Sequence, residues 1–311
     1  MTTKLNKSLT NFYNYKGIKF EEYTIELKNN KIIGRPIIKH DTKINVVNNV
    51  DGLEILLSLC NLYNKYTYKE STNDDNLELG IKNWCNQHVH PANNNNLIRT
   101  IELFDYKKDN LSKRKQDVNI KELHEAIDKY VRFNVEEFKN QLERLTTNFN
   151  MWYALDMSCN HNNIDLLQVR INNGMIAPTT DLIYIINNSK KNKERINKIK
   201  KISWKILGKM IYFMPASKRK LIYLKDRDTF EYSIYTDSIF DIALDVFGAL
   251  IKNTYNNNQY AHKIIVCENC GDYFIRTGST QRYCNKKECQ AARNRNKVKA
   301  FNERNKKEQL L

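Results

Sequence analysis

The chain has 311 residues, 28% of them charged, and a formal net charge of +16 at pH 7. This length allows one large domain or two smaller ones with a substantial buried core, and the positive charge indicates an anionic partner. No apolar run resembles a signal peptide or a membrane-spanning helix, because the most hydrophobic stretch, ILGKMIYFMP, contains Lys209 and ends at Pro215. We therefore expect a cytoplasmic protein that does not bind membranes and keeps its thiols reduced.

Short strands are predicted in the first part of the chain and again near its middle. Apolar and polar side chains alternate over 23–27 and 43–47, and the expected breaks between strands are Asn29–Asn30 and Gly34–Arg35–Pro36. Aromatic and β-branched residues return at 183–186 and 229–236, which predicts further strands there.

Helices are predicted where apolar residues recur at helical spacing. Asp51 and Glu54 form a helix-starting pair, and Ser238 and Asp241 repeat that spacing at the start of SIFDIALDVFGALI. The expected helices start at Asp51, cover 77–88, run through about 119–146 and cover 238–251.

A basic helix is predicted within SKKNKERINKIKKISWKILGKMI. Apolar residues such as Ile199 and Leu207 occupy one side, as in a helix that packs on a core. The basic side is open to three interpretations: a solvated face, an extension of a phosphate-binding surface, or, less favoured, a membrane-surface helix. Its residues are Lys191, Arg195, Lys198, Lys205 and Lys209.

These elements predict an α+β fold with two domains. Residues 1–260 would form a helix-rich domain with short strands, which could sense a small-molecule effector. Residues 261–311 would form a small C-terminal domain, and NTYNNNQYAH (253–262) is the natural boundary between the two.

Four of the seven cysteines lie within CENCGDYFIRTGSTQRYCNKKEC, which has the spacing of a metal site. Four thiolates complete a closed tetrahedron around Zn²⁺ and leave no position for substrate or water, so one structural zinc ion is predicted. The predicted ligands are Cys267, Cys270, Cys284 and Cys289. Cys60, Cys85 and Cys159 are scattered, and we expect them to be buried as small apolar residues.

The surroundings of these cysteines predict a treble-clef-like module. KIIV and YFIR are strand-like and flank ENCG, where Gly271 permits a tight turn that aims both thiols inward. TGSTQ turns the chain back so that QRYC delivers Cys284, and a helix follows from Cys289. About fifty residues form little core, so the metal would supply much of the folding free energy.

This pattern resembles the CGNR-type zinc finger of bacterial stress-induced transcription regulators. The likeness covers about 263–304: Cys-x2-Cys, an aromatic hairpin, a Tyr–Cys return, and a last cysteine followed by Arg and Lys. In that family the finger follows a larger α+β domain called ABATE, which implies DNA binding and transcription regulation here. Cys289 is followed by QAARNRNK instead of Gly-Asn-Arg, so the chain resembles a divergent relative of the family.

Positive charge is concentrated in two regions. Residues 262–311 hold twelve Lys and Arg against five Asp and Glu, and residues 189–227 hold fourteen against two. On the terminal helix, Asn294 and Asn296 could reach base edges. A solvated tail and a protein or membrane partner are the alternatives to nucleic-acid contact. The predicted phosphate-contacting residues are Arg293, Arg295, Lys297, Lys299 and Arg304.

No catalytic constellation is found in the sequence, so we do not expect an enzyme. Cys85, His88 and His90 could form a second metal site, but His88 shares an apolar face with Trp84, which favours a core histidine. The favoured function is a DNA-binding transcription regulator, with RNA also possible as the nucleic acid. A zinc-stabilised protein-interaction module is the alternative, and an unrecognised enzyme is the third hypothesis.

Overall fold

The computed structural model has two compact units, Met1–Ile251 and Lys252–Leu311, which are described separately. The sequence-based boundary at 260/261 lies outside the described residues. In the hairpin 218–235 and at a few helix positions only the backbone is described. The described residues are 15–38, 45–68, 77–92, 131–189, 191–212, 218–224, 229–235, 238–255 and 263–308.

The first unit begins with two small antiparallel sheets. Strand β1 (Tyr15–Lys19) pairs with β4 (Asn45–Val50), while β2 (Tyr23–Lys28) pairs with β3 (Lys31–Pro36). Asn29 and Asn30 both have positive φ, as required in a two-residue hairpin turn, so the predicted break is confirmed as the turn between β2 and β3.

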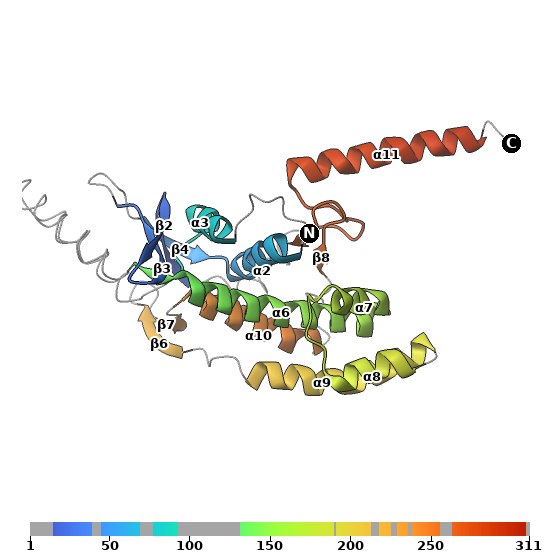
Figure 1. Ribbon diagram of the computed structural model, residues 1–311, viewed down its shortest axis with the longest axis horizontal. Helices are drawn as coiled ribbons and strands as arrows, with labels where there is room; N and C mark the ends of the chain where they lie inside the picture. The colour runs from blue at the N-terminus through green and yellow to red at the C-terminus, as the bar shows by residue number, and fades with distance from the viewer. Residues whose placement is uncertain are drawn as a thin grey trace, which may run out of the picture. The chain divides into compact units, whose positions relative to one another are not determined.

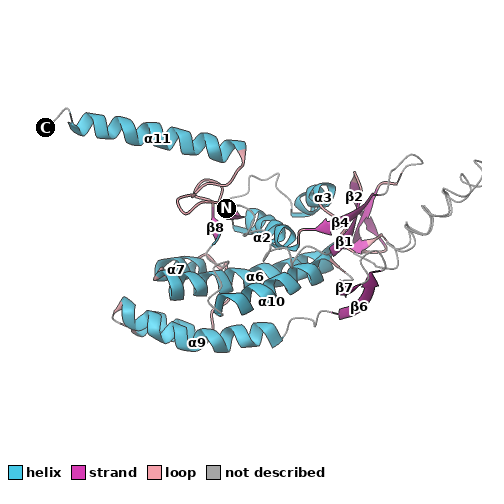
Figure 2. Cartoon of the chain, turned by 180° about the vertical axis from the view of Figure 1, so that it is seen from behind, coloured by secondary structure: helices cyan, strands magenta, loops and turns pink. Residues whose placement is uncertain are grey.

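Three further strands are described in this unit. Strand β5 (Phe133–Asn134) adds to β3, and β6 (Lys218–Leu224) forms a separate hairpin with β7 (Thr229–Tyr235). The predicted strand at 229–236 is thus confirmed. In the first unit the strands gather at one end of the helices (Figure 2).

Seven helices are described in the first unit, and side-chain caps define several of their ends. The Asp51 carboxylate accepts hydrogen bonds from the backbone N–H groups of Leu53 and Glu54, as its spacing predicted. The helices are α2 (Gly52–Tyr68), α3 (Leu77–Gln87), α6 (Val135–His161), α7 (Ile164–Asn172), α8 (Thr180–Asn188), α9 (Asn192–Tyr212) and α10 (Ile239–Tyr255).

The core of the first unit forms around α6, which contacts α2, α7 and α9. Along its length α6 also packs against α10 (Figure 1), where Phe138 lies 5.0 Å from Phe240 and Phe149 lies 5.6 Å from Phe247, ring centre to ring centre. Trp152 completes this aromatic cluster and is almost fully buried. Aromatic burial of this extent supplies a core that needs no metal.

Three sequence predictions in the first unit are wrong. Gly34–Arg35–Pro36 is not a break, because β3 runs through these residues and pairs with β2 as far as Pro36. Residues 183–186 belong to helix α8, because Leu182, Ile185 and Ile186 recur at helical spacing and are buried together, which overrides their β propensity. The predicted helix over 119–146 is interrupted at 131–134, where β5 lies, and α6 then continues to His161. The residues of that prediction before 131 lie outside the described part of the chain.

The second unit is a short hairpin followed by a long helix. Strand β8 (Ile264–Val266) pairs with β9 (Tyr273–Ile275), as KIIV and YFIR predicted, and α11 covers Lys287–Glu308. Helix α11 starts before Cys289 and not at it. Among the helices that the structure describes, none combines the length and the hydrophobicity needed to cross a bilayer.

The reciprocal cap of α10 gives a stability prediction. The backbone N–H of Ser238 donates to the Asp241 carboxylate at 3.1 Å, and the Asp241 N–H donates to the Ser238 hydroxyl oxygen at 3.2 Å. We expect Ser238→Ala to lower the free energy of unfolding by about 1 kcal/mol, since one helix-end donor loses its partner. Urea unfolding measures this free energy. Asp241→Asn keeps an acceptor oxygen and should therefore lower the free energy of unfolding by less than Ser238→Ala does. An unchanged urea midpoint for Ser238→Ala would contradict the role of the cap.

Candidate metal centre

The turn between β8 and β9 carries the first two cysteines. The Cys267 N–H donates to the Asp272 carbonyl at 2.8 Å, and the Gly271 N–H donates to the Cys267 carbonyl at 2.9 Å. Gly271 has a φ of 72°, a conformation that costs glycine little and residues with a Cβ more. The chain therefore folds back tightly enough for Cys267 and Cys270 to face the same point.

The loop after β9 and the first turn of α11 supply the other two cysteines. The Gln281 side chain closes this loop, because its amide oxygen accepts from the Thr277 N–H at 2.8 Å and its amide nitrogen donates to the Tyr283 carbonyl at 3.1 Å. The segment QRYC returns without forming a strand, and a hydrogen bond from the Glu268 N–H to the Arg282 carbonyl links it to the turn.

The four predicted cysteines converge on one point. Their sulfur atoms all lie within 4.8 Å of one another, and the Cys270 and Cys284 sulfurs are 3.7 Å apart. A tetrahedron with metal–sulfur distances of about 2.3 Å has sulfur–sulfur edges of about 3.8 Å. Cys267, Cys284 and Cys289 are buried and Cys270 is half-buried, so this group has the geometry and shielding to hold a metal ion.

Hydrogen bonds from amides favour the thiolate form of Cys267. Burial raises the pKa of this thiol, but the backbone N–H groups of Cys270, Cys284 and Asn269 outweigh burial and lower the pKa to about 7. The Cys284 N–H, for example, lies 3.3 Å from the Cys267 sulfur. For Cys284 burial dominates and raises the pKa to about 11, so Cys267 is the more acidic of the two thiols.

Polar side chains fix the start of α11 on the cysteine cluster. The Gln290 amide donates to the Cys284 carbonyl at 2.7 Å, and the Asn269 amide lies 3.5 Å from the Cys289 sulfur. Ala292 is buried, and the Asn296 amide donates to the Tyr283 hydroxyl at 2.9 Å. These contacts hold the first ten residues of the helix against the cysteine-bearing loops.

The predicted phosphate-contacting residues lie along the exposed part of α11. Arg293, Arg295, Lys297 and Lys299 are all exposed, and Arg293 also donates to the Gln290 amide oxygen at 3.2 Å. Arg304 belongs to α11, but its side chain lies outside what the structure describes. The structure thus places the described cations on one helix that is anchored at its start.

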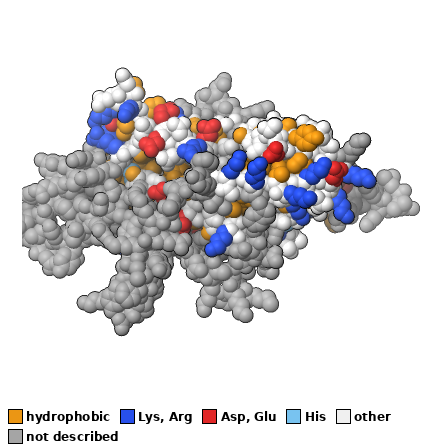
Figure 3. All heavy atoms as spheres, turned by 90° about the horizontal axis from the view of Figure 1, so that it is seen from below, with side chains coloured by type: hydrophobic (Ala, Val, Ile, Leu, Met, Phe, Trp, Pro, Cys, Tyr) orange, Lys and Arg blue, Asp and Glu red, His pale blue; other side chains and the backbone are white. Residues whose placement is uncertain are grey.

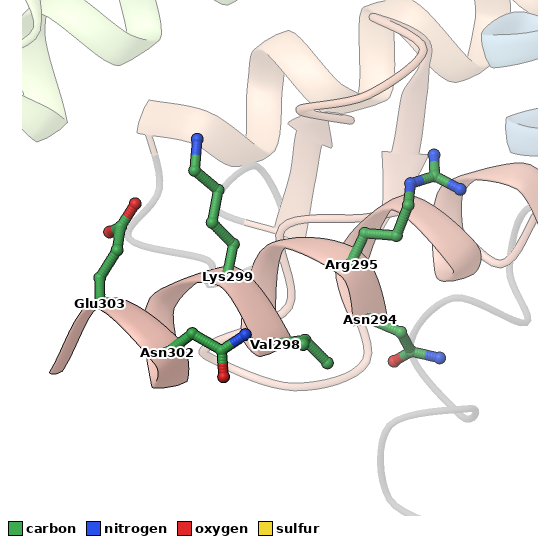
Figure 4. A pocket seen from close by; sticks show the side chains of 6 residues that line it. All are labelled: Asn294, Arg295, Val298, Lys299, Asn302 and Glu303. Carbon is green, nitrogen blue, oxygen red and sulfur yellow. The ribbon is translucent and has the colours of Figure 1, made fainter. Parts of the chain in front are cut away.

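Rows of side chains four residues apart divide the surface of α11. Arg295, Lys299 and Glu303 point to one side, and Asn294, Val298 and Asn302 line the adjacent side (Figure 4). These six residues line a pocket of about 650 Å³.

The sequence analysis gave Asn294 and Asn296 the same role, and the structure places them on different sides of α11. The exposed Asn296 amide donates to the Tyr283 hydroxyl on the finger, whereas Asn294 lies on the side that carries Val298 (Figure 4). The reason is the helical period, which turns position 296 back toward the cysteine cluster.

The second basic region forms an exposed face of α9, as its sequence predicted. Lys and Arg side chains gather on the side of the molecule seen in Figure 3, which includes α9. Lys198 pairs with Glu194 and Lys205 lies 3.6 Å from Asp181, whereas Lys193 and Lys201 have no carboxylate partner among the described residues.

The sequence analysis placed Arg195 on this basic row. It is half-buried instead, because its side chain donates to the Ser189 carbonyl at the end of α8. The remaining members of the predicted row, Lys191, Lys198, Lys205 and Lys209, are exposed.

Cys85, His88 and His90 do not form a second metal site. Among the described residues, the only group able to hold a metal is the cluster of four cysteines. His88 stacks on Trp84 at 4.5 Å, and burial lowers its pKa to about 4. His90 is fully buried and bonded to the Tyr23 hydroxyl, and burial lowers its pKa to about 3. Both are core histidines, and Cys60, Cys85 and Cys159 are buried as expected.

The amides around the cysteines were not found by sequence reasoning. Asn269, Gln281 and Gln290 each bridge segments of the finger, but an amide side chain has no charge or periodicity that distinguishes it from other surface polar residues. Their proximity to the cysteines in sequence was the only available signal.

Comparison with known proteins finds no relative of this chain. No family model, no curated protein and no solved structure matches this chain.

The geometry of the cysteine cluster predicts one metal ion per chain. Metal analysis of the purified protein by mass spectrometry should find this ion, and the double variant Cys284→Ala, Cys289→Ala should lose it because two of the four ligands are gone. The matched control is Cys85→Ala, Cys159→Ala, which removes two buried thiols of the first unit and should leave the metal content unchanged. Metal retained in the first double variant would contradict this ligand set.

The Asn296–Tyr283 contact predicts how firmly α11 is held. Tyr283→Phe removes the hydroxyl acceptor, so hydrogen–deuterium exchange in α11 around Asn296 should accelerate roughly two- to tenfold, with metal content unchanged. Tyr184→Phe, at an exposed tyrosine of α8, is the control. Equal exchange in both variants would mean that the hydroxyl contributes nothing to the position of the helix.

Proposed function

We propose that this chain is a DNA-binding transcription regulator whose second unit is a structural zinc finger. The observation that carries the proposal is a strongly basic, exposed helix, α11, that begins inside a cluster of four cysteines and is held there by amide hydrogen bonds. Such an anchored helix can present its cations in a fixed register to a nucleic acid.

Zinc is the metal that suits this site best. Four sulfur ligands with tetrahedral spacing select Zn²⁺ or iron–sulfur centres, and a closed set of four thiolates in a small module is typical of structural zinc. No ligand position remains for water, so the ion is assigned a folding role and no catalytic one. We assign no catalytic residue to this chain.

The charge and length of α11 suit binding to a DNA duplex. Its 22 residues extend for about 33 Å, close to one turn of B-DNA, so cations along it can follow neighbouring phosphates. After Cys289 the sequence has only Glu303 and Glu308 as acidic residues, whereas a helix that docks on a protein commonly mixes both signs of charge.

The first unit is proposed to carry the regulatory function. The resemblance of the finger to the CGNR type implies a preceding domain that senses an effector, and the separate core of Met1–Ile251 gives such a domain its own stability. The effector would be a small molecule, and the site of action would be bacterial cytoplasm. This part of the proposal depends on the finger motif alone.

A protein-interaction module is the second candidate function. It is favoured by Val298 and Phe301, which are about 60% exposed on α11 and could insert into another protein. The two functions differ in their dependence on salt, because phosphate contacts release counterions and apolar contacts do not.

The proposed function predicts a steep dependence of duplex affinity on salt. The log–log slope should be roughly −0.9 per neutralised phosphate, and Lys297→Ala with Lys299→Ala should flatten it by about two units for every duplex sequence. Fluorescence anisotropy with a labelled random duplex of about 24 base pairs, roughly two turns, measures the slope for the parent protein and for the variant. Zinc content should not change, because neither residue contacts a cysteine.

The matched control removes the same charge from α9. Lys193→Ala with Lys201→Ala deletes two exposed lysines of the first unit and should leave the slope as in the parent protein. The reverse pattern, with loss only in the α9 variant, would move the nucleic-acid site to α9. Absence of duplex binding at low salt by the zinc-loaded protein would refute the proposed function and favour the interaction module.

A further inference from the structure

Helix α11 has a strip of apolar and amide side chains between two basic rows. Asn294, Val298 and Phe301 follow one another at spacings of four and three residues, so they lie on one side of the helix. Val298 is 60% exposed and Phe301 is 63% exposed, although the helix is otherwise strongly polar. The strip therefore faces outward and contributes nothing to the described core of the finger.

The basic rows lie on both edges of this strip. At 100° per residue, Arg293 and Lys297 fall along one edge, and Arg295 and Lys299 fall along the other. Figure 4 shows the second of these rows beside Val298. On the remaining side of the helix, Cys289 and Ala292 are buried on the finger. Any occupant of the strip is thus flanked by cations on both sides.

Charge decides between the possible occupants. In a helix pair formed by two copies of this chain, both edges of each strip would carry Arg and Lys, and like charges at the positions flanking an apolar seam oppose pairing. A duplex instead offers phosphates on both sides of its major groove and base edges along its floor. The groove is about 12 Å wide and admits an α-helix.

The chemistry of the strip fits one kind of base pair. Apolar side chains in the major groove contact the C5-methyl group of thymine, and asparagine can pair with the N6 and N7 positions of adenine. We propose that α11 reads A·T pairs in the major groove, with Val298 and Phe301 contacting thymine methyl groups and Asn294 facing adenine. This inference rests on the proposed function and adds the class of base pair that the helix selects.

Removal of the thymine methyl group tests the proposal directly. The probes are two labelled duplexes of about 24 base pairs (two turns), one of alternating dA and dT and one of alternating dA and deoxyuridine, which differ only by the C5-methyl group. The zinc-loaded full chain should bind the thymine duplex more tightly, by roughly fourfold for each methyl group that is buried. A second pair of duplexes alternates dG with dC in one and dG with 5-methyl-dC in the other. The added methyl group lies in the same groove, so the methylated duplex should bind more tightly.

Variants of the strip should abolish this preference and leave phosphate binding intact. Val298→Ala with Phe301→Ala should bind both A-containing duplexes equally while keeping the salt slope and the zinc content of the parent protein. Val169→Ala is the matched control, because Val169 is 51% exposed on α7 of the first unit. It should keep the full preference for thymine.

The possible results separate this inference from the proposed function. Equal affinity of the parent protein for the thymine and uracil duplexes, with a steep salt slope, would overturn the inference and leave the proposed function standing. Binding to no duplex would overturn both. If sedimentation shows a dimer that Phe301→Ala dissociates, and duplex preference is unchanged, the strip is an interface between copies and the inference is wrong.

Discussion

The second unit depends on the convergence of four cysteine sulfurs on one point. Strands β8 and β9 have three residues each. Among the described residues of this unit, the buried side chains are those of Ile264, Tyr273, Ala292 and three of the four cysteines. Two such strands do not hold together in water without further contacts. The four thiols lie close enough together to hold a metal ion, whose bonds to them would take the place of the missing hydrophobic core.

The same convergence determines where α11 points. Cys289 lies in the first turn of the helix, so any ion shared with the turn at Cys267 ties the helix start to the hairpin. The Gln290 and Asn296 amides then fix the rotation of the helix about its own axis. Rotation matters because it separates the side that faces the finger from the strip and the two basic rows on the open side.

The first unit is held together in a different way. Its aromatic cluster between α6 and α10, with Trp152 at the centre, supplies the hydrophobic burial that the finger lacks. Its exposed lysines on α9 have a plain structural explanation, since the opposite side of that helix buries Ile199 and Leu207. A basic helix on a stable core is therefore weaker support for nucleic-acid binding than a basic helix anchored at a four-thiol site.

Short-range spacing in the sequence was enough to predict the cluster of four cysteines, the Asp51 and Ser238 helix starts, and the break at Asn29–Asn30. Other features depend on contacts that no sequence pattern marks. Packing of Leu182 and Ile186 made 183–186 a helix, the Ser189 carbonyl holds the Arg195 side chain half-buried, and the Tyr283 hydroxyl holds the Asn296 amide. A helix cap or a pair of cysteines can be seen in the sequence because its members lie a few residues apart, whereas burial and the choice of hydrogen-bond partner are set only when the chain has folded.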